Sequence, residues 1–188
     1  MTLLAIYSKT PGLDRFIKST SGLERVLVEL EVYPGHPLRW NYLPEGLTGQ
    51  IIFCDTDDVI YQGDLPELTG IVTAPENVLH KETVWKKHCI GKYEVLLDKP
   101  VYNVGTFSMD AKDLYEYRDF TRHQSRENEW DQLNFNLWLL GKEHTPRINV
   151  FLPLYNNLMY AEKEDGIWHV GGEKAVFVHA NGNNKELL

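Results

Sequence analysis

Three aspartates within four positions carry the clearest chemical signal in this sequence. Asp55, Asp57 and Asp58 directly follow the apolar run at positions 51–54. Such a run predicts a strand buried on both faces, as in the parallel part of an α/β sheet. Three carboxylates at its end repel one another and lose solvation, so they need a neutralising partner. Carboxylate oxygens suit hard divalent cations, and we expect a Mg²⁺ or Mn²⁺ site here, with a solvated acidic turn as the alternative.

The composition of the 188-residue chain is that of a folded domain. Hydrophobic residues make up 43% and aromatic residues 12%, which excludes a disordered chain. The net charge of −8 argues against general binding to polyanions, although a local basic patch stays compatible with it. No basic leader or membrane-length apolar stretch is seen, so we expect a cytoplasmic protein without a membrane partner. Two cysteines do not indicate a disulfide framework, and Cys54 is expected in the core.

The apolar pattern alternates between strands and helices. Strands are expected at 3–7, 25–32, 51–54, 70–74, 101–109 and 174–179. Helices are expected from about residue 13, from residue 111 after a cap at Asp110, and from about 128 to 140 before Gly141. Strands joined by crossover helices predict an α/β fold, with a mixed, mostly parallel sheet flanked by helices. Neither a repeat nor a linker is seen, so one domain is expected over residues 1–188.

Five short motifs follow one another along the chain: Gly12, Arg15, Phe16 and Ser19; Asp55, Asp58 and Val59; Tyr102-Asn103-Val104-Gly105; Asp131-Gln132-Leu133; and His179-Ala180-Asn181-Gly182-Asn183-Asn184-Lys185. In this order they resemble the glycosyltransferase domain of procollagen lysyl hydroxylases and related collagen sugar transferases. Val104 replaces a serine of the family pattern, and the segment before the acidic strand is much shorter here. The resemblance covers nearly the whole chain and implies the GT-A fold of nucleotide-diphospho-sugar transferases.

The resemblance further implies a metal-dependent transfer of glucose or galactose from a UDP-sugar to an acceptor hydroxyl. Asp55 would hold the cation with Asp57 or Asp58, because the general Asp-x-Asp pattern favours Asp57 and the collagen-type pattern favours Asp58. His179 would add a nitrogen ligand, which favours Mn²⁺ over Mg²⁺. Lys185 would contact the diphosphate, whose growing charge a metal and a lysine stabilise in the transition state. The other residues expected to bind the nucleotide-sugar are Ser8, Asp55, Asn103 and Gly182.

The position of Ser8 also predicts nucleotide binding, because Ser8 lies at the carboxyl end of the first strand, where doubly wound sheets bind nucleotides. Asp131 and Gln132 are implied as catalytic residues near the anomeric carbon, Asp131 stabilising oxocarbenium character and Gln132 orienting the sugar. The alternative for Asp131 is an acidic residue that complements a helix dipole. Asn103 would contact the donor sugar or would be a turn residue, and Trp85 would border the sugar pocket. Retention of configuration is implied by the resemblance alone.

The acceptor is left open between a protein hydroxylysine, a glycan hydroxyl and a hydroxymethyl-pyrimidine in DNA. Arg118, Arg122 and Arg126 are spaced by four and share one helical face, which suits nucleic acid; a solvated helix exterior is the alternative. A non-catalytic sugar-nucleotide-binding module is the second class of function, and retention of His179 and Lys185 with the carboxylates favours the enzyme. The sequence does not indicate an oligomeric state.

Overall fold

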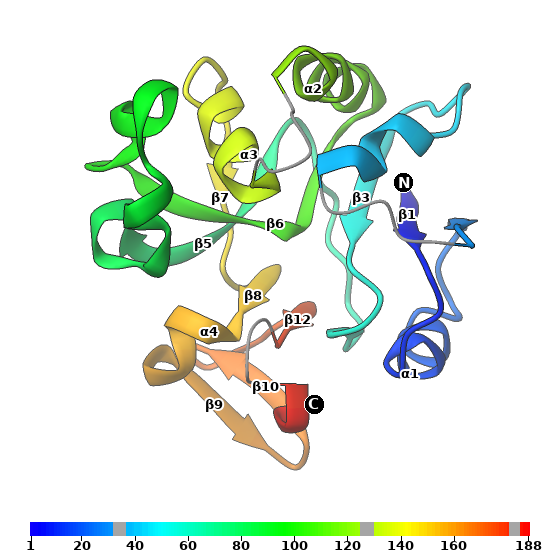
Figure 1. The fold of residues 1–188 in the computed structure, drawn as a ribbon. Helices are drawn as coiled ribbons and strands as arrows, with labels where there is room; N and C mark the ends of the chain where they lie inside the picture. Colours follow the sequence, from blue (N-terminus) through cyan, green and yellow to red (C-terminus); the bar gives the residue numbers. More distant parts are fainter. Residues whose placement is uncertain (32–36, 125–129, 181–184) are drawn as a thin grey trace.

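The computed structural model describes residues 1–31, 37–124, 130–180 and 185–188, and within them the chain forms a six-stranded sheet with helices on both faces (Figure 1). Its strands are β1 (Thr2–Tyr7), β2 (Arg25–Glu29), β3 (Gln50–Cys54), β5 (Val72–Leu79), β6 (Pro100–Asp110) and β7 (Thr145–Pro146), in the order β2-β1-β3-β6-β5-β7. β1 is parallel to β2 and β3, β5 is parallel to β7, and β6 is antiparallel to β3 and β5. The expected α/β class with a mixed sheet flanked by helices is therefore confirmed.

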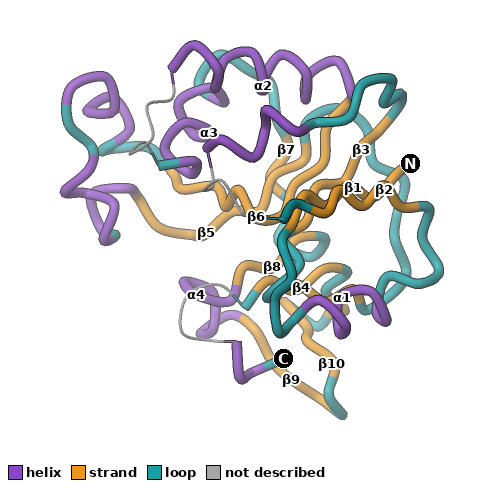
Figure 2. The backbone as a smooth tube through the Cα atoms, turned by 45° about the vertical axis from the view of Figure 1, so that its right-hand side comes forward, coloured by secondary structure: helices purple, strands orange, loops and turns teal. Residues whose placement is uncertain are grey.

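Helices cover the two faces of this sheet in different ways. α2 (Ala111–Gln124) and α3 (Asp131–Leu139) lie on one side of the strands, and α1 (Leu13–Ser19) and α4 (Leu154–Asn157) lie on the other (Figure 2). α1 connects the parallel strands β1 and β2, as a crossover helix does. The short 3₁₀ helices are η1 (Pro37–Tyr42), η2 (His80–Glu82), η3 (Val84–His88), η4 (Gly91–Leu96), η5 (Leu158–Tyr160) and η6 (Lys185–Leu187). No helix in the described ranges has both the length and the apolar character to cross a membrane.

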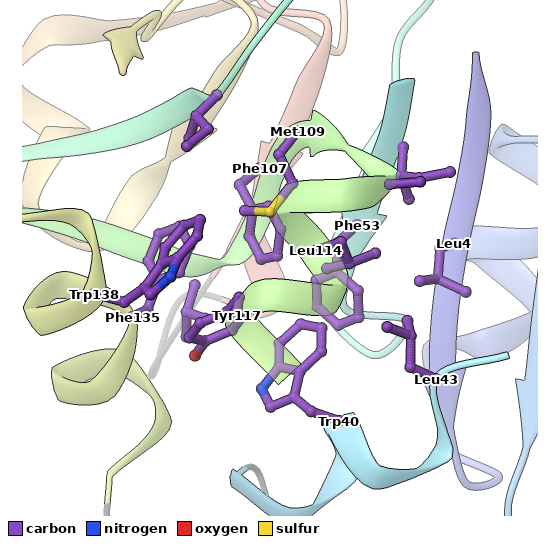
Figure 3. Close-up of a cluster of buried hydrophobic side chains, with 14 of the residues drawn as sticks. Leu4, Trp40, Leu43, Phe53, Phe107, Met109, Leu114, Tyr117, Phe135 and Trp138 are labelled. Atoms are coloured by element: carbon purple, nitrogen blue, oxygen red, sulfur yellow. The ribbon is translucent and has the colours of Figure 1, made fainter. Parts of the chain in front are cut away.

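Strand alternation places a separate core on each face. In β1, Leu4 and Ile6 pack into the cluster beneath α2 and α3, whereas Leu3, Ala5 and Tyr7 pack on the α1 side. The first cluster is rich in aromatic rings from η1, β3, β6, α2 and α3 (Figure 3). Its labelled members are Leu4, Trp40, Leu43, Phe53, Phe107, Met109, Leu114, Tyr117, Phe135 and Trp138. Both faces of β1 and β3 are thus buried, as their continuous apolar runs predict.

Two three-stranded sheets complete the fold below the large sheet (Figure 1). One contains β4 (Val59–Tyr61), β12 (Phe177–His179) and β8 (Phe151–Pro153), and the other contains β9 (Ala161–Glu164), β10 (Ile167–Val170) and β11 (Glu173–Lys174). β12 lies between β4 and β8, antiparallel to the former and parallel to the latter. Because β4 directly follows the acidic residues, this pairing brings the C-terminal segment to them.

Several expected boundaries differ from the structure. The strand expected at 25–32 ends at Glu29, and the helix expected from about 128 begins at Asp131, with positions 32, 128 and 129 outside the described residues. The segment 174–179 forms β11 and β12 instead of one strand, because its two halves pair in different sheets. The strand expected at 70–74 continues to Leu79, and Asn77 takes a left-handed conformation (φ 53°) in its irregular part.

Candidate metal centre

Three ligand-type side chains meet where β3 ends, β4 begins and β12 ends. Among the residues that the structure describes, Asp55, Asp58 and His179 offer ligand atoms within 4.8 Å of one another. His179 Nε2 lies 3.1 Å from Asp58 Oδ1 and 4.0 Å from Asp55 Oδ2. Asp58 Oδ1 is buried and receives no hydrogen bond of acceptable geometry within the described ranges. A buried carboxylate oxygen that faces an imidazole nitrogen and a second carboxylate fits a divalent cation.

The charges around this group are strongly coupled. Burial alone would raise the pKa of the Asp58 carboxyl, but the adjacent His179 and Lys185 outweigh burial and lower it. Burial alone would lower the pKa of His179, but Asp58, Asp55 and Glu76 outweigh it and raise the pKa. The carboxylates of this group therefore favour a positively charged partner.

Gly105 leaves the space that this group occupies. Its carbonyl accepts a hydrogen bond from the Asp55 backbone N–H at 2.8 Å, because β6 pairs with β3 here. A Cβ atom at position 105 would lie 2.2 Å from His179 Cε1 and 2.7 Å from Asp55 Oδ2. Any other residue type at this position would displace the imidazole or the carboxylate, so the centre depends on glycine here.

Asn103 lies behind His179, inside β6. Its Oδ1 is 2.8 Å from His179 Nδ1 and accepts the backbone N–H of Gly105 at 2.8 Å. Its Nδ2 donates to Glu76 Oε1 at 2.8 Å. The alternative that Asn103 is a turn residue is wrong, because it occupies the interior of a strand. Its side chain is buried (3% exposed) and turned toward the imidazole, and its contact with a donor sugar stays a prediction.

Glu76 is a residue of this region that the sequence reasoning missed. It is 2% exposed and accepts amide hydrogen bonds from Asn103, from Gln132 at 3.2 Å and from Asn156 at 2.7 Å. The three amides come from β6, α3 and α4, so the carboxylate joins three elements. The available signal was that Glu76 is the one charged residue of strand β5. Gln132 is thereby connected to His179 through Glu76 and Asn103.

Arg39 is the second missed residue, and it links Asp55 to Asp131. Its Nη1 is 2.5 Å from Asp55 Oδ1, and its Nη2 is 2.8 Å from Asp131 Oδ2. The guanidinium is fully buried, 4.9 Å from the ring centroid of Trp40 and 4.5 Å from that of Phe53. In sequence, Arg39 falls in a connector rich in proline and glycine, where nothing marks it as special.

Asp131 is enclosed by donors. Besides Arg39, Trp40 Nε1 and Tyr117 Oη donate to Asp131 Oδ1, each at 2.8 Å. Burial and Asp131 raise the pKa of Tyr117 well above its usual value, so the phenol donates in its neutral form. Asp131 is also the first residue of α3 and is 3% exposed. Both of its oxygens therefore face protein groups.

Asp57 points away from the three-residue group, toward α1. Its Oδ1 accepts the Gly12 N–H at 3.3 Å, and its carbonyl accepts from Arg15 Nη2 at 3.2 Å. A Cβ at Gly12 would lie 1.8 Å from the Asp57 carbonyl oxygen, which explains the glycine there. Lys185 contacts Asp57 directly and lies 3.6 Å from Asp58 Oδ2. Of the two rival aspartates, the structure brings Asp58 together with Asp55 and His179.

Ser8 and Trp85 are the remaining expected residues that the structure describes, and neither belongs to the three-residue group. Ser8 directly follows β1, at the sheet edge where β3 also ends. Trp85 packs edge-to-face on Trp130, with ring centroids 5.0 Å apart, beside the start of α3. Gly182 lies outside the described residues, as does Arg126.

The arginine face of α2 is engaged within the chain. Arg118 binds Glu45 and Asp119, both at 2.9 Å, and Arg122 donates to Asn41 at 3.0 Å. These bonds favour the structural alternative for this face over contact with nucleic acid.

Comparison with known proteins returns no matching protein-family model and no matching curated protein. The case for a function therefore depends on the motifs and the geometry of the site.

Proposed function

We propose that the protein is a GT-A-type glycosyltransferase that moves a hexose from a UDP-sugar to an acceptor hydroxyl with the help of a divalent cation. The observation that carries this proposal is the buried Asp58 Oδ1 that faces His179 Nε2 at 3.1 Å beside Asp55. The mixed α/β sheet and the order of the five motifs support it.

Each residue of the centre has a task in this reaction. A bound cation would supply Lewis-acid stabilisation of the diphosphate leaving group. Asp55, Asp58 and His179 hold it, and the nitrogen ligand favours Mn²⁺ over Mg²⁺. Lys185, already beside the carboxylates, adds positive charge for the phosphates.

Ser8 and Gly182 are assigned to the nucleotide, and Gln132 to orienting the sugar. The enclosure of Asp131 by Arg39, Trp40 and Tyr117 favours a positioning role through Arg39 over the expected contact with the anomeric carbon.

The test is a melting experiment with Mn²⁺ and UDP. Asp58→Asn keeps the shape of the side chain but removes a charged ligand, so we expect the ligand-induced shift of the wild type to be largely lost. Asp98→Asn is the matched control, because Asp98 is an exposed aspartate that pairs with Lys81 and does not belong to the centre. Equal shifts in the wild type and Asp58→Asn would falsify the metal assignment.

Turnover separates the enzyme from a non-catalytic binding module. We expect Mn²⁺-dependent hydrolysis of UDP-glucose or UDP-galactose by the wild type, and we expect Asp58→Asn to abolish it. A protein that binds UDP without hydrolysing or transferring either sugar would be a binding module. Mass spectrometry of products from protein, glycan and hydroxymethylated-DNA acceptors would then identify the acceptor hydroxyl.

A further inference from the structure

The two ring nitrogens of His179 face different surroundings. Nε2 points to Asp58 Oδ1 at 3.1 Å and to Asp55 Oδ2 at 4.0 Å, whereas Nδ1 is 2.8 Å from Asn103 Oδ1. A cation binds only a ring nitrogen that carries no proton. Which nitrogen holds the proton therefore decides whether His179 can complete the centre.

The orientation of the Asn103 amide is fixed from two sides. The Gly105 N–H can only donate, so the atom 2.8 Å from it must be the amide oxygen. The Glu76 carboxylate accepts, so the atom 2.8 Å from it must be the amide nitrogen. The reversed amide would set N–H against N–H and oxygen against oxygen. The oxygen therefore faces His179, and it requires a proton on Nδ1.

We propose that Asn103, oriented by Glu76, is a positioning residue that keeps the single proton of the neutral His179 ring on Nδ1, so that Nε2 is the nitrogen available to the cation. This inference rests on the proposed function, because metal binding is part of it. All three residues are buried, with exposures of 2% for Glu76, 3% for Asn103 and 5% for His179. Gln132 and Asn156 hold the Glu76 carboxylate in place from α3 and α4. Such partners of a metal-binding histidine fix its tautomer and ring orientation.

The first measurement needs no metal. In protein labelled with ¹⁵N-histidine, we expect a Nδ1–H resonance of His179 that exchanges slowly with water, because it is buried against Asn103. Asn103→Leu should lose this protection. A wild-type spectrum in which Nδ1 of His179 carries no proton overturns the inference.

The second measurement is the Mn²⁺ dissociation constant. We expect Asn103→Leu and Glu76→Gln each to weaken Mn²⁺ binding by about 10–100-fold. Asn149→Leu is the control, because the Asn149 amide also donates to a carboxylate, that of Glu173 at 2.7 Å, and takes no part in the contacts among Glu76, Asn103 and His179. Wild-type affinity in Asn103→Leu would overturn the inference.

Exchanging the carboxylate and the amide between positions 76 and 103 tests the positioning role of Asn103 separately from any loss of folding. In the double variant Asn103→Asp with Glu76→Gln, the new carboxylate can accept from His179 Nδ1–H and Gly105 N–H, and the new amide can donate to it. We expect this variant to bind Mn²⁺ within about threefold of the wild type, whereas Asn103→Asp alone binds much more weakly. A double variant as weak as the single one overturns the inference. Failure of the wild type to bind Mn²⁺ would instead overturn the proposed function, and the Nδ1–H resonance would still decide the orientation of His179.

Discussion

At the scale of single residues, Arg39 has the largest structural consequence near the site. Its guanidinium is fully buried between the carboxylates of Asp55 and Asp131 and packs against the Trp40 and Phe53 rings. A buried cation between two acids holds their geometry and compensates their charge. The position of Asp55 in the metal centre therefore depends on Arg39, a residue that need not touch the metal ion.

Replacing the Arg39 guanidinium by an uncharged side chain should lower the stability of the fold. Arg39→Met keeps much of the side-chain volume but leaves the buried Asp131 charge uncompensated, so we expect a loss of about 3–5 kcal/mol of unfolding free energy in urea denaturation. Arg39→Met combined with Asp131→Asn should recover part of the loss, since the orphaned charge is then absent. A single variant as stable as the wild type would contradict the buried ion-pair account.

The residues that escaped sequence reasoning share one property. Arg39 and Glu76 bind partners that are distant in the sequence, such as Asp131 for Arg39 and Asn156 for Glu76. The three residues of the centre could be predicted from the sequence. Asp55 and Asp58 are close in the sequence and repel each other, which indicates a positive partner, and the motif spacing marks His179. A single buried charge leaves no comparable local pattern.

At the scale of elements, β6 limits the volume of the centre. Gly105→Ala would place a methyl group 2.2 Å from His179 Cε1 and 2.7 Å from Asp55 Oδ2. We expect a loss of about 1–3 kcal/mol in unfolding free energy, together with loss of the Mn²⁺-induced rise in melting temperature. Gly22→Ala is the control, because nothing lies within 4 Å of a Cβ built there. Equal effects of the two substitutions would contradict the packing argument.

Elements with long apolar runs were predictable, whereas short pieces were not. β1 and β3 are buried on both faces, so their apolar runs are visible in the sequence. β4, β8 and β12 have three residues each, and their pairing with one another sets their limits more than their own residue pattern does. α3 was located but its start was misplaced, because nearly every residue in it is buried and it shows little amphipathic contrast.

At the scale of the whole molecule, a buried histidine away from the centre gives stability a pH dependence. His80 is fully buried; its Nδ1 lies 3.0 Å from the Lys99 carbonyl oxygen, and its Nε2 has no hydrogen-bond partner within the described ranges. Burial lowers the pKa of His80, although the Lys99 carbonyl and Glu76 oppose the shift. The unfolded chain therefore takes up a proton at a higher pH than the folded protein does.

Because the pKa of His80 is lower in the folded protein than in the unfolded chain, acid destabilises the fold through this residue. The stability that neutral His80 contributes is complete above about pH 6.5 and is lost as the pH falls from there to the lower folded pKa. His80→Gln can still donate to the Lys99 carbonyl but does not titrate. We expect the stability difference between wild type and His80→Gln to shift in favour of the variant between about pH 8 and about pH 5. Parallel stability curves in urea denaturation would refute this.

The position of β12 between β4 and β8 bears on the order of events during translation. The acidic residues emerge from the ribosome early, but the strand that carries His179 can pair with β4 only after more than a hundred further residues have been made. Nascent chains that lack this strand have Asp55 and Asp58 without His179, which is an incomplete ligand set. Tight manganese binding would therefore appear late in synthesis, and a ribosome-bound chain truncated before residue 177 should not acquire it.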